Sequence, residues 1–124
     1  MREETKRWLD YAKQDLISAK INFKSKVYYV SSFLCQQAAE KALKAVLVEK
    51  DQLLKIHDIT SLAEQVKLPV DLKEKCGDLT TAYVTTRYPD SSNVRSAFDL
   101  KTADRLIQIA AAILIWSEKE LSTS

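Results

Sequence analysis

Turn-forming residues are scarce in this sequence. Only one glycine and two prolines occur among its 124 residues. Tight turns draw heavily on these two residue types, so a sheet of several strands would lack material for its connections. Alanine, leucine, lysine, glutamate and glutamine are plentiful instead, and all five favour helices. The composition therefore predicts long helices with short connections and argues against a sheet.

The length and charge narrow the class of protein further. A chain of this length predicts a single domain over residues 1–124, which buries roughly two thirds of its unfolded surface on folding. The 19 basic and 17 acidic residues are well mixed and give a net charge of +2. Nucleic-acid modules usually carry a more basic footprint. We therefore expect no DNA partner.

The cysteines and the apolar segments indicate a cytoplasmic protein. Cys35 and Cys76 are isolated, which is typical of small core residues in a reducing compartment. Residues 1–7 are charged and no apolar run follows them, so they do not resemble a signal peptide. The longest apolar run, 106–116, is shorter than the roughly 20 residues of a membrane span. It predicts a buried helix and no membrane partner.

Apolar residues recur every three or four positions and outline five helices. The predicted helices are 4–24, 27–50, 58–67, 71–87 and 99–120. The turn between the first two is so short that they should run antiparallel. The fold class is therefore all-α: an antiparallel up-and-down four-helix bundle with one extra short helix.

Local signals set the ends of these helices. Asp58, Asp71 and Asp99 are predicted N-caps, and Asp71 has the capping-box spacing with a glutamate three positions later. The second helix is apolar almost all round, which predicts the central position in the bundle. Gly77 lies inside the fourth helix, where it costs about 1 kcal/mol relative to alanine. We expect it to mark a close helix crossing.

The second helix carries the first candidate functional group, made of Gln36, Gln37, Glu40 and Lys44. Three of these residues are spaced by four positions and share one face, and Glu40 to Lys44 is a favourable ion-pair step. One interpretation is a solvated stripe on an otherwise buried helix. The other is a polar seam that faces a cleft between helices or a second subunit.

The second candidate group lies where the fourth helix ends. Arg87, Tyr88 and Arg95 offer guanidinium groups for phosphates and an aromatic face for a base. Arg87 is equally explained by the negative end of a helix dipole. His57, the only histidine, precedes a helix and is most often structural in such a place. It has no clustered partner for a metal, so we expect neither a metal nor a cofactor.

Three segments in this order resemble the HEPN domain family, named for a nucleotide-binding domain of higher eukaryotes and prokaryotes. They are Gln36-Gln37-Ala38-Ala39-Glu40-Lys41-Ala42-Leu43-Lys44-Ala45, then His57-Asp58, then Thr86-Arg87-Tyr88-Pro89-Asp90. The resemblance runs from Trp8 to about Trp116. It implies a helical bundle, a homodimer, and a nucleotide or RNA as partner. From the chemistry of the residues themselves, we expect such a ligand to lie between the polar face of the second helix and the bend after the fourth helix. The predicted ligand-binding residues are Gln36, Gln37, Glu40, Lys44, His57, Arg87, Tyr88 and Arg95.

One element of the family is missing. Members that cleave RNA as toxins carry an arginine followed four to six residues later by a histidine, and neither Arg87 nor Arg95 has that histidine. Cleavage by a 2′-hydroxyl needs an acid–base group with a pKa near neutrality, which histidine supplies most readily. We therefore assign no catalytic residue.

Three functions remain open on the sequence alone. The first is a non-enzymatic binding and interaction module that acts with a small nucleotidyltransferase-like protein in a toxin–antitoxin-like system, as the resemblance implies. The second is a ribonuclease toxin with a variant active site. The third is a purely structural helical dimer. The broad apolar surfaces of the second and last helices favour a homodimer in each case.

Overall fold

The computed structural model describes residues 1–52, 55, 58–87 and 98–123, with the backbone alone over 83–87. Its helices are α1 (Glu3–Lys24), α2 (Tyr28–Glu49), α3 (Ile59–Val66), α4 (Val70–Arg87) and α6 (Leu100–Ser122). No strand occurs within these ranges. The predicted all-helical fold is confirmed, and each helix begins and ends within two residues of its predicted bounds.

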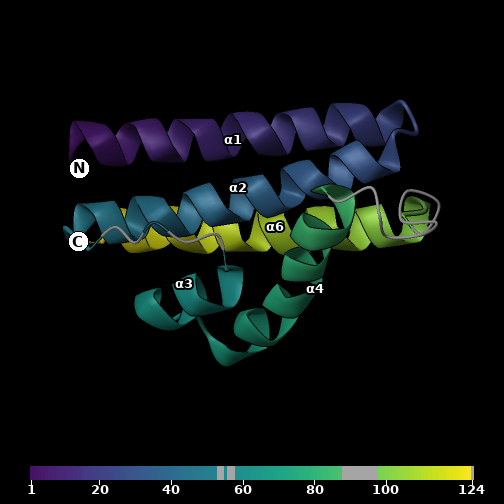
Figure 1. The fold of residues 1–124 in the computed structure, drawn as a ribbon. Helices are drawn as coiled ribbons and strands as arrows, with labels where there is room; N and C mark the ends of the chain where they lie inside the picture. The colour runs from purple at the N-terminus through teal and green to yellow at the C-terminus, as the bar shows by residue number, and fades with distance from the viewer. Residues whose placement is uncertain (53–54, 56–57, 88–97, 124) are drawn as a thin grey trace.

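The three longest helices form a layer over the two shorter ones (Figure 1). α2 returns antiparallel to α1, and α6 runs alongside α2 in the same direction. α4 crosses below them at a steep angle, and α3 lies beside its first turns. Because α4 is inclined rather than aligned, α2 packs directly on α6 as well as on α1, α3 and α4. The expected central position of α2 is therefore confirmed.

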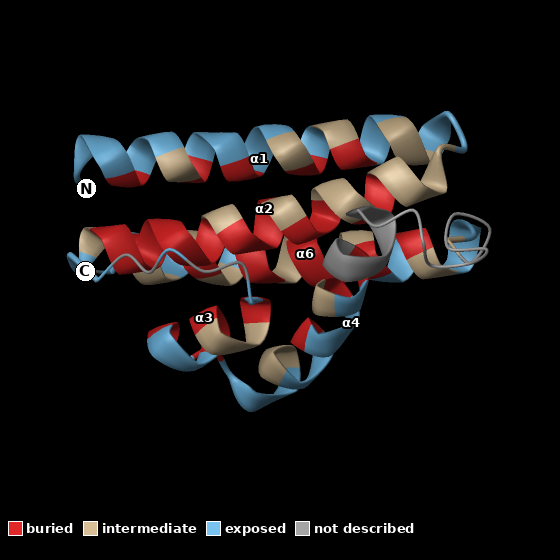
Figure 2. Cartoon of the chain, in the orientation of Figure 1, coloured by how far each residue is buried: buried red, intermediate tan, exposed pale blue. Residues whose placement is uncertain are grey.

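The core is built around α2 (Figure 2). Its alanines at 38, 39, 42 and 45 are fully buried, and their small side chains let neighbouring helices approach closely. Leu43 and Leu47 are also fully buried and fill the space between the helices. Both cysteines are buried, as the sequence predicted. None of the described helices is long and apolar enough to cross a membrane.

Three helices end in the same way without a glycine. After α1, the Val27 amide donates to the Asn22 carbonyl at 2.9 Å, and Lys26 between them has a left-handed φ of 64°. Asp51 and Lys67 occupy the same position after α2 and α3, with φ of 57° and 59°. This Schellman arrangement usually employs glycine, because a side chain is disfavoured at positive φ.

Two predictions about α4 are wrong. Asp71 is not an N-cap, because the helix already begins at Val70 and the Lys73 amide donates to the Pro69 carbonyl at 2.9 Å. Asp71 instead lies in the first turn, where its charge complements the helix dipole. Gly77 does not mark a close crossing, since it is exposed and a Cβ built on it would meet no atom within 4 Å. The predicted caps at Asp58 and Asp99 are confirmed by side-chain hydrogen bonds to the amides of Thr60 and Thr102.

Candidate functional site

A chain of hydrogen-bonded polar side chains runs along α2. Gln37 Nε2 donates to Gln36 Oε1 at 2.6 Å, and Gln36 Nε2 donates to Glu40 Oε1 at 2.9 Å. Lys44 Nζ donates to the other carboxylate oxygen, Glu40 Oε2, at 2.8 Å. The spacing of four residues makes the links from Gln36 to Glu40 and from Glu40 to Lys44 possible, because it places these side chains one turn apart on one face.

This polar chain is inside the protein. Gln36 is fully buried, Glu40 and Lys44 are 4% and 5% exposed, and Gln37 is half-buried. The solvated stripe is therefore excluded as an interpretation of these residues. A buried charge is tolerated only when it is paired and hydrogen-bonded, and the Glu40 carboxylate meets both conditions.

Trp8 of α1 covers the lysine end of the chain. Lys44 Nζ lies 5.5 Å from the centre of the Trp8 ring, within the range of a cation–π contact. Next to it, Lys41 Nζ is 2.5 Å from Asp15 Oδ2 and 5.8 Å from the Tyr11 ring centre. α1 thus supplies aromatic cover for both lysines of α2 and a counter-charge for Lys41.

The other predicted site residues are only partly placed. Arg87 is the last residue of α4, which packs on α2. His57, Tyr88 and Arg95 lie outside the described residues, as does the side chain of Arg87. The structure therefore brings together Gln36, Gln37, Glu40 and Lys44 and does not test the second half of the predicted set.

The cysteines do not add a reactive group. Burial raises the pKa of Cys35 to about 12. Burial is the larger cause that raises the pKa of Cys76 to about 11, and the nearby charge of Asp58 is the smaller one. Thiols with such values are protonated at neutral pH and are poor nucleophiles. In the described ranges, no three His, Cys, Asp or Glu residues cluster closely enough to hold a metal ion.

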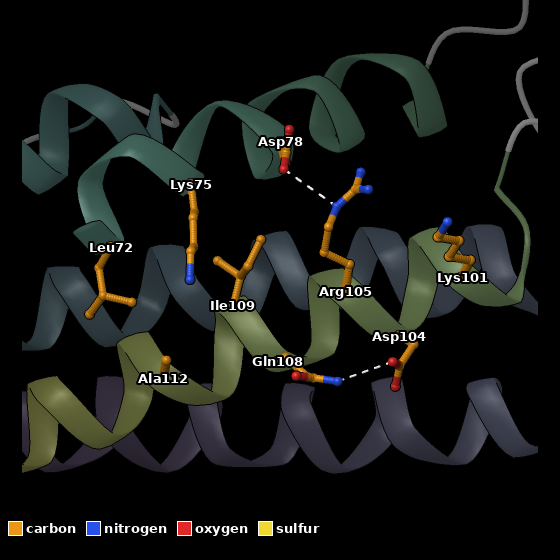
Figure 3. A pocket seen from close by; sticks show the side chains of 9 residues that line it. All are labelled: Leu72, Lys75, Asp78, Lys101, Asp104, Arg105, Gln108, Ile109 and Ala112. Atoms are coloured by element: carbon orange, nitrogen blue, oxygen red, sulfur yellow. Dashed lines mark hydrogen bonds and ion pairs between the residues drawn. The ribbon is translucent and has the colours of Figure 1, made fainter. Parts of the chain in front are cut away.

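A groove between α4 and α6 was not predicted. It has a volume of about 590 Å³, and its apolar side chains gather towards one end while most of its charged side chains lie towards the other (Figure 3). Its lining residues are Leu72, Lys75, Asp78, Lys101, Asp104, Arg105, Gln108, Ile109 and Ala112. The spacing of Lys101 and Arg105 on one helix face was readable in the sequence, but no local pattern indicated that α4 lies opposite them.

Comparison with known families decides the identity of the fold. The pattern of the HEPN domain matches residues 5–121. The chain belongs to the HEPN domain family. This confirms the resemblance seen in the three sequence segments, and the HEPN match covers the whole bundle from α1 to the last turn of α6. No match is found among curated proteins.

Solved structures agree with this assignment. TT1696 from Thermus thermophilus is similar with a TM-score of 0.89 and 29% identity, covering 96% of this chain and 99% of that one. The archaeal HEPN homologue ST0689 has a TM-score of 0.83 and 29% identity, covering 96% and 98%. An HEPN domain protein from Thermotoga maritima, tm0613, has a TM-score of 0.79 and 28% identity, covering 94% and 98%.

Proposed function

We propose that this HEPN-domain protein is a cytoplasmic, non-enzymatic module that binds a nucleotide or RNA and acts with a small nucleotidyltransferase-like partner in a toxin–antitoxin-like system. The observation that carries the proposal is the match of the HEPN domain over residues 5–121, together with a sequence that lacks the histidine after Arg87 or Arg95. The family supplies the class of ligand. The missing histidine removes the acid–base group that metal-independent RNA cleavage would use.

The ligand site in this proposal lies at the end of α4, a helix that packs on α2. Arg87, Tyr88 and Arg95 would supply the phosphate and base contacts, and Gln37 is the half-buried end of the polar chain nearest to solvent. The buried members of the chain, Gln36 and Glu40, would hold Gln37 in place rather than contact the ligand. Gln36 supports this role directly, since its carbonyl accepts the Gln37 amide at 2.6 Å.

A titration tests the site. Binding of mononucleotides and short single-stranded RNA is measured for the wild type and for Arg87→Ala and Arg95→Ala, with thermal melts of each protein. Arg7→Ala, an exposed arginine on α1, is the matched control. The proposal expects weaker binding for the Arg87 and Arg95 variants with unchanged melting. Absence of binding at millimolar ligand, or normal binding by both variants, refutes the site.

The absence of catalysis is tested separately. The purified protein is incubated with RNA in the presence of a chelator, and no cleavage is expected. Efficient cleavage that is lost in His57→Ala would replace this proposal by the ribonuclease-toxin alternative. Co-purification with the product of an adjacent nucleotidyltransferase gene, if the gene exists, tests the proposed partner.

A homodimer is part of the same proposal. Ile17 and Ile21 on α1 and Ile115 on α6 are each more than half exposed, which supports an interface over these helices. Light scattering at tens of micromolar protein is expected to give twice the chain mass. A monomer mass would refute both the dimeric module and the structural-dimer alternative.

A further inference from the structure

The groove between α4 and α6 has more cationic than anionic groups. Lys75 of α4 and Lys101 and Arg105 of α6 line it, against two carboxylates, Asp78 and Asp104. Both carboxylates are engaged by residues of the groove itself. Asp104 accepts from Gln108 Nε2 at 3.0 Å, and Asp78 lies 3.5 Å from Arg105 Nε.

The cationic side chains of the groove, by contrast, still have N–H groups that can donate to a ligand. Within the described parts of the chain, Lys75 forms no hydrogen bond or ion pair, and Lys101 has only a longer-range electrostatic interaction with Asp99. The ion pair with Asp78 involves only the Nε of Arg105, so the two terminal nitrogens of its guanidinium remain available. Figure 3 shows the Lys75 ammonium pointing from α4 towards α6, across the groove.

One end of the groove is apolar. Ile109 is almost fully buried, while Leu72 and Ala112 are half-buried, and Figure 3 shows these three side chains towards one end of the groove, with Arg105 and Lys101 towards the other. A volume of about 590 Å³ is typical of pockets for small molecules, which range over about 300–1,000 Å³. The groove can therefore hold a small apolar body and an anionic group at the same time.

We propose that the α4–α6 groove binds a small molecule that carries a phosphate group on an apolar body. The oxygens of a phosphate can accept hydrogen bonds from the Arg105 fork and from Lys101, one turn away on α6, whereas a carboxylate offers only two oxygens. Lys75 adds a positive charge from the α4 side of the groove. The apolar body lies on Leu72, Ile109 and Ala112. This site is independent of the proposed function, because it shares no residue with the polar chain on α2 or with Arg87, Tyr88 and Arg95.

Phenyl phosphate is the probe for the test, since it joins one phosphate to one flat apolar ring. Its binding to the full chain is measured by calorimetry and compared with inorganic phosphate and with phenol. The wild type should bind phenyl phosphate more tightly than either fragment, and high salt should weaken it. Amide shifts in nuclear magnetic resonance should concentrate in α4 and in the first half of α6.

The variants decide whether the groove is responsible. Lys75→Gln combined with Arg105→Gln should weaken phenyl phosphate binding by about tenfold, because each exposed ion pair contributes a few-fold. Lys119→Gln, an exposed lysine on α6 outside the groove, is the matched control and should bind as the wild type does. Arg87→Ala is measured alongside, because it reports any phosphate that binds at the end of α4 instead of in the groove.

Three results would overturn the inference. They are no binding to the wild type at millimolar probe, equal losses in the double variant and in Lys119→Gln, and normal binding by the double variant. Loss of binding in Arg87→Ala with normal binding by the double variant would place the phosphate at the end of α4. That result would refute the groove and leave the proposed function standing.

Discussion

Removing the carboxylate of Glu40 should damage the fold more than any surface charge change. The Glu40 side chain is 5% exposed and accepts from Lys44 Nζ at 2.8 Å and from Gln36 Nε2 at 2.9 Å. In Glu40→Ala, the ammonium of Lys44, whose side chain is 7% exposed, loses this acceptor inside the bundle. The fully buried amide of Gln36 loses its acceptor as well.

The expected cost follows from these two losses. Breaking a buried ion pair by removing one partner typically costs about 3–5 kcal/mol, because the remaining charge is left uncompensated. That is a large share of the roughly 5–15 kcal/mol that stabilises a domain. Glu40→Gln keeps the shape and one acceptor oxygen, so its cost should be smaller, about 1–3 kcal/mol for the lost charge-assisted hydrogen bond.

Urea unfolding followed by far-UV circular dichroism measures these differences. Lys13→Met is the matched control, because Lys13 and Glu118 form an ion pair at 3.6 Å whose side chains are 45% and 42% exposed. Such exposed pairs contribute at most about 1 kcal/mol. If Glu40→Ala loses no more than Lys13→Met, the polar chain on α2 does not stabilise the bundle. The double variant Glu40→Gln/Lys44→Met should cost less than the two single changes combined, by about 1–3 kcal/mol.

Three further predictions concern the rest of the bundle. Gly77→Ala should stabilise the protein by about 0.5–1 kcal/mol in the same urea assay, because a helix interior disfavours glycine. The added methyl group meets no atom within 4 Å, so it should cause no strain. A loss of stability would contradict this prediction. Cys35 and Cys76, with pKa values of about 12 and 11, should react with Ellman's reagent at pH 8 only after unfolding, and rapid labelling of the native protein would refute the burial. Hydrogen bonds from Thr102 to Asp99 hold the pKa of that carboxyl below its ordinary value of 3.8. The stabilisation from these hydrogen bonds is therefore present above pH 3.8 and is lost as the pH falls through the lowered pKa of Asp99. Asp99→Asn should flatten this part of the stability–pH curve.

Much of the fold could be predicted because its signals are local. Helical periodicity, the aspartates before α3 and α6, and the near-absence of turn residues act over a few positions of the chain, and they placed all five helices. The same local reasoning failed at Gly77 and Asp71. A helical glycine has no signature that distinguishes a close crossing from an exposed surface. A capping box also requires the helix to start directly after the capping residue, whereas α4 already starts before Asp71, at Val70.

The polar face of α2 shows most clearly which properties the sequence determines and which only the tertiary structure decides. Its sequence determined that Gln36, Glu40 and Lys44 lie on one helix face and can pair with one another. Whether that face meets water was decided by packing between helices, since the neighbouring helices bury it in the folded chain and Trp8 of α1 lies over Lys44. The α4–α6 groove is a tertiary property for the same reason. A four-residue spacing fixes neighbours along one helix, whereas the partner across a groove depends on how distant segments fold together.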